Sequence, residues 1–365
     1  MKIICTQENL KSGLVIVSRI ISSTNTLPIL NNILLKTDNG VLKISSTNLE
    51  IAITTNVRCK VEEIGEVTVT SKTFVDLVSN LPNKNIVLET KDNDLLINTE
   101  NYHTKLKTMS AEEFPLIPQV ENKKSINCDA QEFKTSVDMV VFAASTNQTQ
   151  PEISGLLFAQ DSNILRVVAT DRYRLAEKKL ALVSEGLDTE VILPQKTVLE
   201  ISRIIGSQKG NLEIIFSETQ AAVNFNDTQI ISRLVDGQYP PYKEIIPKNF
   251  LCSTVVEKSQ FVSALRAVSV FGQSSSSVHV EIDSQKQQII LSSGSTDLGN
   301  SSVELAAAVT GTGPILILNY HYLLDCLNAI DTKNVIIKTI DDNSPSLILP
   351  EDKADYIYLV MPIKS

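Results

Sequence analysis

The sequence predicts an α+β protein built from three repeated two-layer domains. One stretch carries the prediction, because a run that reads strand, short helix, turn, strand occurs at 67–90, again at 191–216 and again at 316–340. The three copies start 124 and 125 residues apart. A solenoid repeat spans only about 20–50 residues, whereas this period is the length of a small domain. The predicted domains are residues 1–120, 125–248 and 249–365.

Amphipathic helices are the first element of this pattern. In the first copy, Phe74, Leu77, Val78 and Leu81 follow the i, i+3, i+4, i+7 spacing of a helix with one buried face. Each third holds a second amphipathic helix ahead of the repeated stretch. The six helices are predicted at 8–21, 71–80, 130–144, 195–205, 258–271 and 319–330.

Short alternating strands fill the rest of each third, about eight in each. The run at 40–45 is an example, and Asp38-Asn39-Gly40 before it is a hairpin turn signal. An antiparallel sheet with its helices on one face is a two-layer α+β domain. Neighbouring domains can protect their sheet edges by pairing edge to edge, so that a curved row of them closes on itself.

Proline-containing segments mark the two domain boundaries. Phe114-Pro-Leu-Ile-Pro118 ends the first third, and the segment from Tyr239 to Asn249 ends the second. The residues that lead into each segment also match at an offset of 125. These segments are therefore predicted to be linkers of equivalent position.

Composition narrows the possible functions. The net charge of −9 argues against wrapping nucleic acid by overall attraction. Five dispersed cysteines indicate reduced thiols, and three widely separated histidines give no metal or cofactor motif, so none is predicted. No apolar run is long enough to span a membrane, and the first residues do not read as a signal peptide. A cytoplasmic protein is expected.

Several sequence motifs then show a resemblance to a known family over essentially the whole chain. They are the triple repeat, the run at 27–35, Ala169-Thr-Asp-Arg-Tyr-Arg-Leu175, Ser232-Arg-Leu-Val-Asp-Gly-Gln-Tyr-Pro-Pro-Tyr242 and the ending Tyr358-Leu-Val-Met-Pro-Ile363. In this order they resemble the bacterial DNA polymerase III beta subunits, the sliding clamps. The resemblance implies the DNA-clamp fold, with antiparallel sheets outside and two helices per domain inside. It also implies a non-catalytic processivity factor.

The family's partners follow from the same resemblance. It implies a head-to-tail homodimer whose six domains form a ring around double-stranded DNA without reading its sequence. The polymerase III catalytic subunit, the clamp loader and other proteins with a clamp-binding motif would dock on the ring. Loose phosphate attraction permits sliding, whereas base contacts would fix a position.

Basic residues on the predicted helices are the candidates for DNA contact. The six helices together carry +2 against −9 for the chain, so the segregation of charge has the expected sign. Ordinary solvated helix charges explain the same residues equally well. The candidates that face DNA are Lys11, Arg19, Lys72, Lys196, Arg203 and Arg266.

The resemblance also implies a pocket for partner peptides, which are short segments rich in glutamine and leucine. Apolar side chains and methionine suit such a cleft, and tyrosine and arginine supply hydrogen bonds that set orientation. The family has glycine and histidine where this chain has Arg172 and Tyr173, so peptide preference is expected to differ. The matching residues are Ile153, Thr170, Arg172, Tyr173, Arg174, Leu175, Pro240, Ile245, Asn319, Tyr322, Leu359, Met361, Pro362 and Ile363.

Two other functions compete with the clamp. Asp171 and the pair Asp341-Asp342 could be acids of an enzyme, yet the sequence lacks a phosphate loop, an HExxH motif and a paired-carboxylate signature. The second alternative is a monomeric three-repeat scaffold that binds proteins and does not encircle DNA. For the clamp, Val270 and Phe271 are further candidates for the contact between subunits.

Overall fold

The chain forms two compact units, each with one continuous antiparallel sheet. The computed structural model describes residues 1–22, 27–120, 125–183, 189–272, 276–295 and 299–363. Unit 1 comprises residues 1–131 and 196–234, and unit 2 comprises residues 132–195 and 235–365. The middle third of the chain therefore contributes to both units.

The elements of the first third alternate helices with hairpins as predicted. In order they are β1 (Lys2–Thr6), α1 (Gln7–Ser18), η1 (Pro28–Asn31), β2 (Asn32–Asp38), β3 (Val41–Thr47), β4 (Ile51–Arg58), β5 (Lys60–Glu63), β6 (Glu66–Thr70), α2 (Ser71–Asn80), β7 (Asn85–Lys91), β8 (Asp94–Thr99), β9 (Tyr102–Met109) and η2 (Ala111–Glu113).

The second third repeats this order with one more short helix and one strand fewer. Its elements are β10 (Ser125–Asp129), α3 (Ala130–Asp138), η3 (Val141–Ala143), α4 (Pro151–Ser154), β11 (Gly155–Asp161), β12 (Ile164–Thr170), β13 (Arg174–Ala181), β14 (Thr189–Pro194), α5 (Gln195–Ile205), β15 (Asn211–Phe216), β16 (Gln220–Phe225), β17 (Thr228–Arg233) and η4 (Tyr242–Ile245).

The last third closes the series. It contains β18 (Cys252–Glu257), α6 (Lys258–Ser269), β19 (Ser277–Asp283), β20 (Gln288–Ser295), β21 (Gly299–Gly311), β22 (Ile315–Asn319), α7 (Tyr320–Ala329), β23 (Asn334–Thr339), β24 (Ser346–Pro350) and β25 (Tyr356–Val360).

Each sheet crosses a boundary between repeats. In unit 1 the order is β10-β15-β16-β17-β4-β3-β2-β6-β9-β8-β7-β1-β5, and β17 of the second third pairs with β4 of the first. In unit 2 it is β14-β11-β12-β13-β25-β24-β23-β18-β21-β20-β19-β22, and β13 pairs with β25 of the last third. Edge-to-edge pairing of neighbouring repeats is thus confirmed at both junctions.

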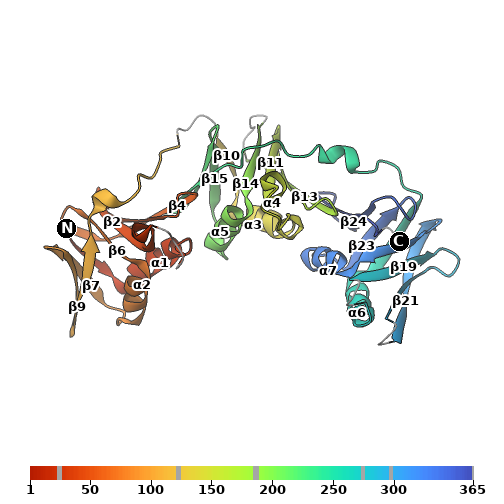
Figure 1. The fold of residues 1–365 in the computed structure, drawn as a ribbon, viewed down its shortest axis with the longest axis horizontal. Coiled ribbons are helices and arrows are strands. Elements are labelled where there is room, and N and C mark those ends of the chain that lie inside the picture. Colours follow the sequence, from red (N-terminus) through yellow and green to blue (C-terminus); the bar gives the residue numbers. More distant parts are fainter. Residues whose placement is uncertain (23–26, 121–124, 184–188, 273–275, 296–298, 364–365) are drawn as a thin grey trace. The chain divides into compact units, whose positions relative to one another are not determined.

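Helices pack on the sheets through the predicted apolar faces. Leu10, Leu14 and Val17 of α1 are fully buried. Gly13 lets α1 approach β4, since a Cβ there would lie 2.5 Å from a methyl carbon of Val57. In unit 1, α1 and α2 lie side by side against the strands, and in unit 2, α6 and α7 do the same (Figure 1). The two-layer α+β prediction is confirmed.

Two local predictions can be compared directly with the backbone. Asn39 and Gly40 both have positive φ, +46° and +83°, as the expected tight hairpin requires. The helix predicted at 130–144 ends at Asp138, and a 3₁₀ turn follows at Val141–Ala143. Val140 and Ala143 are buried as in a helix, so hydrophobic spacing alone does not reveal where the backbone tightens.

Candidate functional site

The site is organised by a tight loop between β12 and β13 of unit 2. The Thr170 hydroxyl donates to the Arg174 carbonyl at 2.7 Å and accepts from the Arg172 backbone N–H at 3.1 Å. One carboxylate oxygen of Asp171 accepts from the N–H groups of Tyr173 and Arg174, each at 2.9 Å. These bonds close the loop and hold Arg172 at a φ of +77°. A non-glycine residue in this left-handed region is uncommon and marks a constrained backbone.

The C-terminal tail runs along this loop. The Met361 N–H donates to the Tyr173 carbonyl at 2.8 Å, and the Ile363 N–H donates to the Ile317 carbonyl of β22 at 2.8 Å. Met361 and Pro362 are half-buried, whereas Tyr173 is 65% exposed. The tail therefore has fixed ends beside an exposed aromatic ring.

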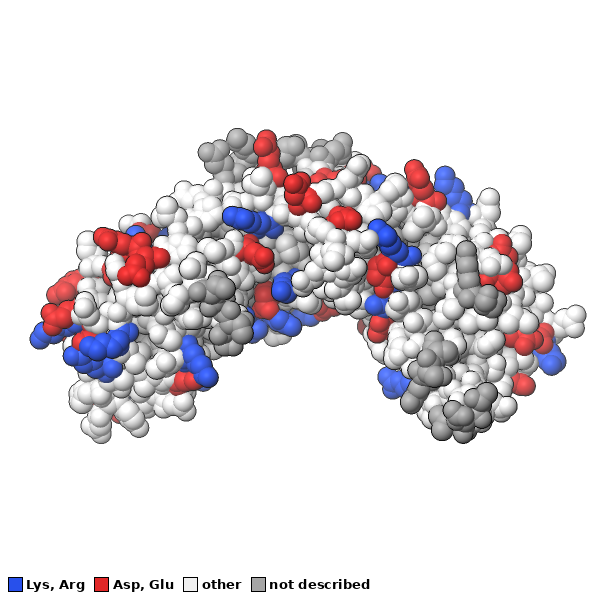
Figure 2. All heavy atoms as spheres, in the orientation of Figure 1, with Lys and Arg blue, Asp and Glu red and all other residues white. Residues whose placement is uncertain are grey.

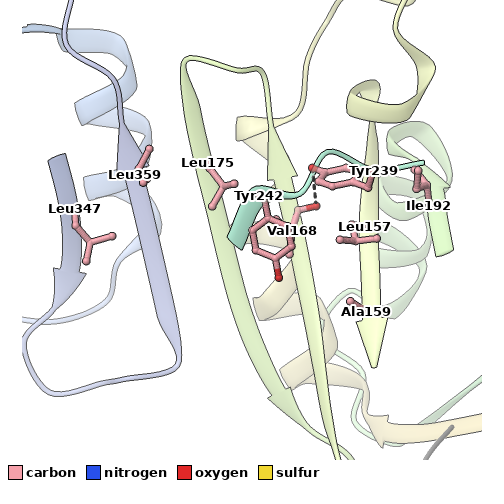
Figure 3. Packing of buried hydrophobic residues seen from close by; sticks show 9 residues of the cluster. All are labelled: Leu157, Ala159, Val168, Leu175, Ile192, Tyr239, Tyr242, Leu347 and Leu359. Atoms are coloured by element: carbon pink, nitrogen blue, oxygen red, sulfur yellow. Dashed lines mark hydrogen bonds between the residues drawn. The ribbon is translucent and has the colours of Figure 1, made fainter. Parts of the chain in front are cut away.

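An apolar cluster lies beside the loop and the tail. Leu175 on β13 and Leu359 on β25 are cross-strand partners, and Met361 packs against their cluster. Figure 3 shows these leucines on neighbouring strands, together with Tyr239 and Tyr242 from the linker that precedes β18. The Tyr239 hydroxyl donates to the Val168 carbonyl at 3.5 Å. The linker thus packs on the sheet next to the site.

Arg174 is the charged centre of the site. Its Nε donates to Asp171 at 3.0 Å, and one of its terminal nitrogens donates to Asp325 of α7 at 2.6 Å. Its guanidinium carbon lies 4.3 Å from the ring centroid of Tyr322 and 5.6 Å from that of Phe142, both cation–π distances.

The pKa values of two groups in the site are raised, for different reasons. Burial opposes the charge of Arg174, but the hydrogen bond that it donates to Asp325 and the nearby acidic groups raise its pKa above the ordinary value. Burial, then the charge of Asp171, raise the pKa of the Tyr322 hydroxyl. Arg174 is therefore cationic and Tyr322 neutral at any physiological pH.

We define the junction site as the loop Thr170–Leu175, Tyr322 and the tail Leu359–Ile363. Hydrogen bonds, a cation–π contact and apolar packing connect most of the predicted set: Thr170, Arg172, Tyr173, Arg174, Leu175, Tyr322, Leu359 and Met361, while Ile363 joins through Ile317. Pro362 lies between two anchored residues of the tail.

Four predicted residues lie outside that network of contacts. Ile153 is buried on the short helix α4, and Asn319 caps α7 by accepting the His321 N–H at 2.9 Å. Pro240 follows Tyr239 on the linker, and Ile245, 48% exposed, ends η4. Their place in a peptide site stays a prediction.

Sequence reasoning missed Phe142 and Asp325. Asp325 stands three residues after Tyr322 on α7, a spacing that puts both on one side of the helix. That spacing could have indicated Asp325 as a residue of the site. Phe142 is distant in sequence and lies in a 3₁₀ turn, so no sequence signal identified it.

The candidate acids of an enzyme have ordinary structural roles. Asp171 closes the loop, and Asp341 accepts the N–H groups of Asn343 and Ser344 in the same fashion. The interaction with the Ser344 side chain, followed by these backbone hydrogen bonds, lowers the pKa of Asp341. Among the described residues, no group of three His, Cys, Asp or Glu side chains is placed to hold a metal ion.

The six basic candidates for DNA contact are all exposed. Five lie on helices α1, α2, α5 and α6, and Arg19 is the residue after α1. With the helix bounds of the structure, the six predicted helices carry +1, one charge fewer than the longer predicted ranges. On the face drawn in Figure 2, acidic and basic side chains are interspersed. Contact with nucleic acid stays a prediction for each residue.

Family models match the chain in three consecutive parts. They are the DNA polymerase III beta subunit N-terminal domain over residues 1–118, the central domain over 127–241 and the C-terminal domain over 243–364. Among the helices of the described residues, none is both long and apolar enough to cross a membrane.

Relatives and solved structures agree with these models. The chain is 29% identical to the beta sliding clamp of Synechocystis sp., with 100% of this chain and 99% of the relative covered, and 28% identical to that of Staphylococcus epidermidis, with 94% of each covered. It is similar to the crystal structure of the DNA polymerase III beta subunit from Thermotoga maritima, at a TM-score of 0.92 and 26% identity over 100% of this chain and 99% of that one. It is also similar to the Pseudomonas aeruginosa sliding clamp bound to griselimycin, at a TM-score of 0.96 and 25% identity over 100% of both chains. Matched along essentially its whole length, the chain belongs to the DNA polymerase III beta subunits, the sliding clamps that serve DNA replication as non-catalytic processivity factors.

Proposed function

We propose that two copies of this chain join head to tail into a ring around duplex DNA. In this proposal the ring holds the polymerase III catalytic subunit, the clamp loader and other partners by short peptides bound at the junction site. It acts in the cytoplasm, whose reducing conditions suit a chain with five cysteines and no disulfide framework. Its domains are residues 1–120, 125–248 and 249–365. Family membership favours the clamp over a monomeric scaffold.

Two open strand edges support the subunit contact. Among the described strands, residues 102–107 of β9 pair only with β8, because β6 reaches just Thr108 and Met109. In the part of the chain that the structure describes, residues 299–306 of β21 pair only with β20, because β18 begins its pairing at Ala307. Within the described residues each unit thus presents a strand edge with free backbone groups. Such edges attract a further strand, and pairing β9 of one copy with β21 of the other would cover both.

Apolar side chains beside these edges fit the same contact. Leu106 and Val303 are half-buried on the two edge strands. Val270, the residue after α6, is 51% exposed, and α6 packs against β21. A head-to-tail contact propagates unless geometry closes it, and three similar domains per chain favour closure after two copies.

Sedimentation of the full chain tests the dimer. The expected mass is twice the 40.1 kDa of one chain at micromolar concentration. A species of one chain mass at that concentration would support the scaffold instead.

Weak contact with the DNA backbone is the second part of the proposal. Lys72 and Lys196 occupy equivalent repeat positions, each as the second residue of its helix. Both are exposed and without an ion-pair partner among the described residues. Such charges attract phosphates without reading bases, and the attraction falls steeply as salt rises. The expected result is weak, salt-dependent binding to a short linear duplex and long retention on a closed circular duplex after loading. Tight binding to one short linear sequence would contradict it.

The junction site carries the third part. The conformation of the tail supports peptide binding there. Met361 packs on the apolar cluster, and its N–H donates to the Tyr173 carbonyl. An apolar floor with arginine and tyrosine at the rim suits a leucine-containing peptide whose backbone needs hydrogen bonds. Fluorescence anisotropy with a labelled peptide rich in glutamine and leucine tests it, and competition by the unlabelled peptide controls for specificity.

A further inference from the structure

The loop of the junction site has a twin in unit 1. The Thr47 hydroxyl donates to the Ile51 carbonyl and accepts from the Leu49 N–H, both at 3.0 Å. The Asn48 side chain accepts the Ile51 N–H at 2.8 Å. Leu49 has a φ of +74°, against +77° for Arg172. The two loops are therefore closed by the same set of hydrogen bonds.

The next strand is also attached in the same way. In unit 1 the Arg233 N–H donates to the Glu50 carbonyl at 3.0 Å, as the Met361 N–H donates to the Tyr173 carbonyl at 2.8 Å in unit 2. The residue equivalent to Arg174 is Ile51, which is buried. An apolar side chain in that place is thus compatible with every backbone bond of the loop.

It follows that the charges around Arg174 are not needed to build the loop. The Arg174 side chain is 11% exposed, and that of Asp171 is 15% exposed. Burying an ion pair gives little net stability, because desolvation offsets the attraction. The loop of unit 1 forms the same backbone hydrogen bonds without a buried ion pair. The charged cluster of unit 2 therefore serves something other than folding.

We propose that Asp325 is a positioning residue of the junction site, which holds the Arg174 guanidinium against the Tyr322 ring so that its free N–H groups face a bound peptide. This inference rests on the proposed peptide site. Asp325 comes from α7, whereas Asp171 comes from the loop itself, so the two carboxylates fix the guanidinium from two separate elements. A guanidinium has five N–H donors in a rigid fork. Each carboxylate takes one and the Tyr358 hydroxyl also lies beside the guanidinium, and donors remain for the backbone carbonyls of a peptide.

Peptide affinity of an Asp325→Asn chain tests the proposal. The Asp325 side chain is 43% exposed, so the folded state tolerates the change, and circular dichroism and the sedimentation mass should stay those of the wild type. Anisotropy with the labelled glutamine- and leucine-rich peptide should give an affinity about tenfold weaker, the size of a moderate coupling between contacting groups. Asp161→Asn is the matched control, because Asp161 pairs with Arg166 at 3.2 Å on the hairpin β11–β12. That variant should bind the peptide as the wild type does.

A double-mutant cycle separates positioning from a merely structural effect. If Asp325 acts through Arg174, Asp325→Asn should change the affinity less than twofold in a chain that already carries Arg174→Leu. Wild-type affinity in Asp325→Asn alone, or the full tenfold loss in the Arg174→Leu background, would overturn the inference while leaving the peptide site intact. A wild-type chain that fails to bind the peptide would overturn the proposed site and this inference with it.

Discussion

The backbone N–H of Met361 donates a hydrogen bond to the carbonyl oxygen of Tyr173 at 2.8 Å. This bond joins the tail of the last repeat to the loop of the middle repeat within unit 2. It continues the pairing of β13 with β25, which ends at Arg174 and Val360. The tail is therefore an extension of the sheet, and its conformation beside the loop is set by backbone bonds.

Truncation after Val360 should abolish peptide binding. The change removes the Met361 side chain from the apolar cluster and both tail hydrogen bonds, and we expect the affinity for the labelled peptide to fall about a hundredfold or more. The remaining sheet keeps all of its strands, so the sedimentation mass should not change. A chain that ends at Ile363 is the control and should bind normally. Unchanged affinity of the shorter chain would reject the site.

Val270→Asp should weaken the dimer. The Val270 side chain is 51% exposed in the single chain, so a carboxylate there costs the monomer little, but the proposed subunit contact would bury its charge. Placing an unpaired charge in an interface costs several kcal/mol, which is about a hundredfold or more in dimer affinity. Sedimentation over a dilution series measures the dimer affinity. Ile64→Asp is the control, since Ile64 is 84% exposed and lies between β5 and β6, outside the strand segments proposed for the contact; equal behaviour of the two variants would exclude Val270 from the interface.

Much of the fold was predictable because the physical signal was repeated. The helix at 71–80 has the same bounds in sequence and structure, since Phe74 and Val78 fall on one face and Leu81 ends it. The hairpin at Asn39-Gly40 follows from turn chemistry alone. In contrast, the end of α3 at Asp138 leaves no trace in the hydrophobic spacing.

The site was predictable only where its residues are contiguous. The loop Thr170–Leu175 and the tail Leu359–Ile363 are short runs that a motif can reveal. Phe142 and Asp325 reach Arg174 through tertiary packing, and no local pattern specifies such a contact. The twin loop at Thr47–Ile51 was also missed, because its residues share hydrogen-bonding capacity with the Thr170 loop and little else.

Buried tyrosines should make unit 2 sensitive to alkaline pH. Burial is the largest cause that raises the pKa of Tyr239, Tyr242, Tyr356 and Tyr358, and a hydrogen bond to Glu177 adds to it at Tyr242. Each of these pKa values is higher in the folded chain than the value of about 10 in the unfolded chain. The stabilisation is therefore complete below pH 10 and is lost as the pH rises through the folded values.

Absorbance of tyrosinate measures this directly, because the chain has no tryptophan. Part of the signal should appear only well above pH 10 and should coincide with loss of the far-ultraviolet circular dichroism. In strong denaturant all eight tyrosines should titrate near pH 10. Tyr242→Phe should reduce the late signal by one residue. Native titration of all tyrosines near pH 10 with intact secondary structure would contradict the burial argument.

Gly311→Ala should destabilise unit 2 strongly, for two reasons. The same substitution at a second glycine separates them. Gly311 pairs with Cys252 across β21 and β18 and has a φ of +91°. A Cβ there would lie 2.0 Å from the Leu251 carbonyl oxygen, so the backbone must move. Gly40 has a similar φ of +83° but no atom within 4 Å of its would-be Cβ. A positive φ alone lowers the free energy of unfolding of an alanine variant by about 1–2 kcal/mol. A positive φ together with a backbone clash should lower it by about 4 kcal/mol.

Thermal unfolding of the two variants compares these costs. For units of this size, 1 kcal/mol lowers the midpoint by about 2–4 °C, so Gly40→Ala should unfold a few degrees early and Gly311→Ala about 10 °C early. The drop in Gly311→Ala should appear in the transition that also exposes the buried tyrosines, because seven of the eight tyrosines belong to unit 2. Equal shifts in the two variants would mean that φ strain is the whole effect and that the approach of β18 to Gly311 is not tight in solution.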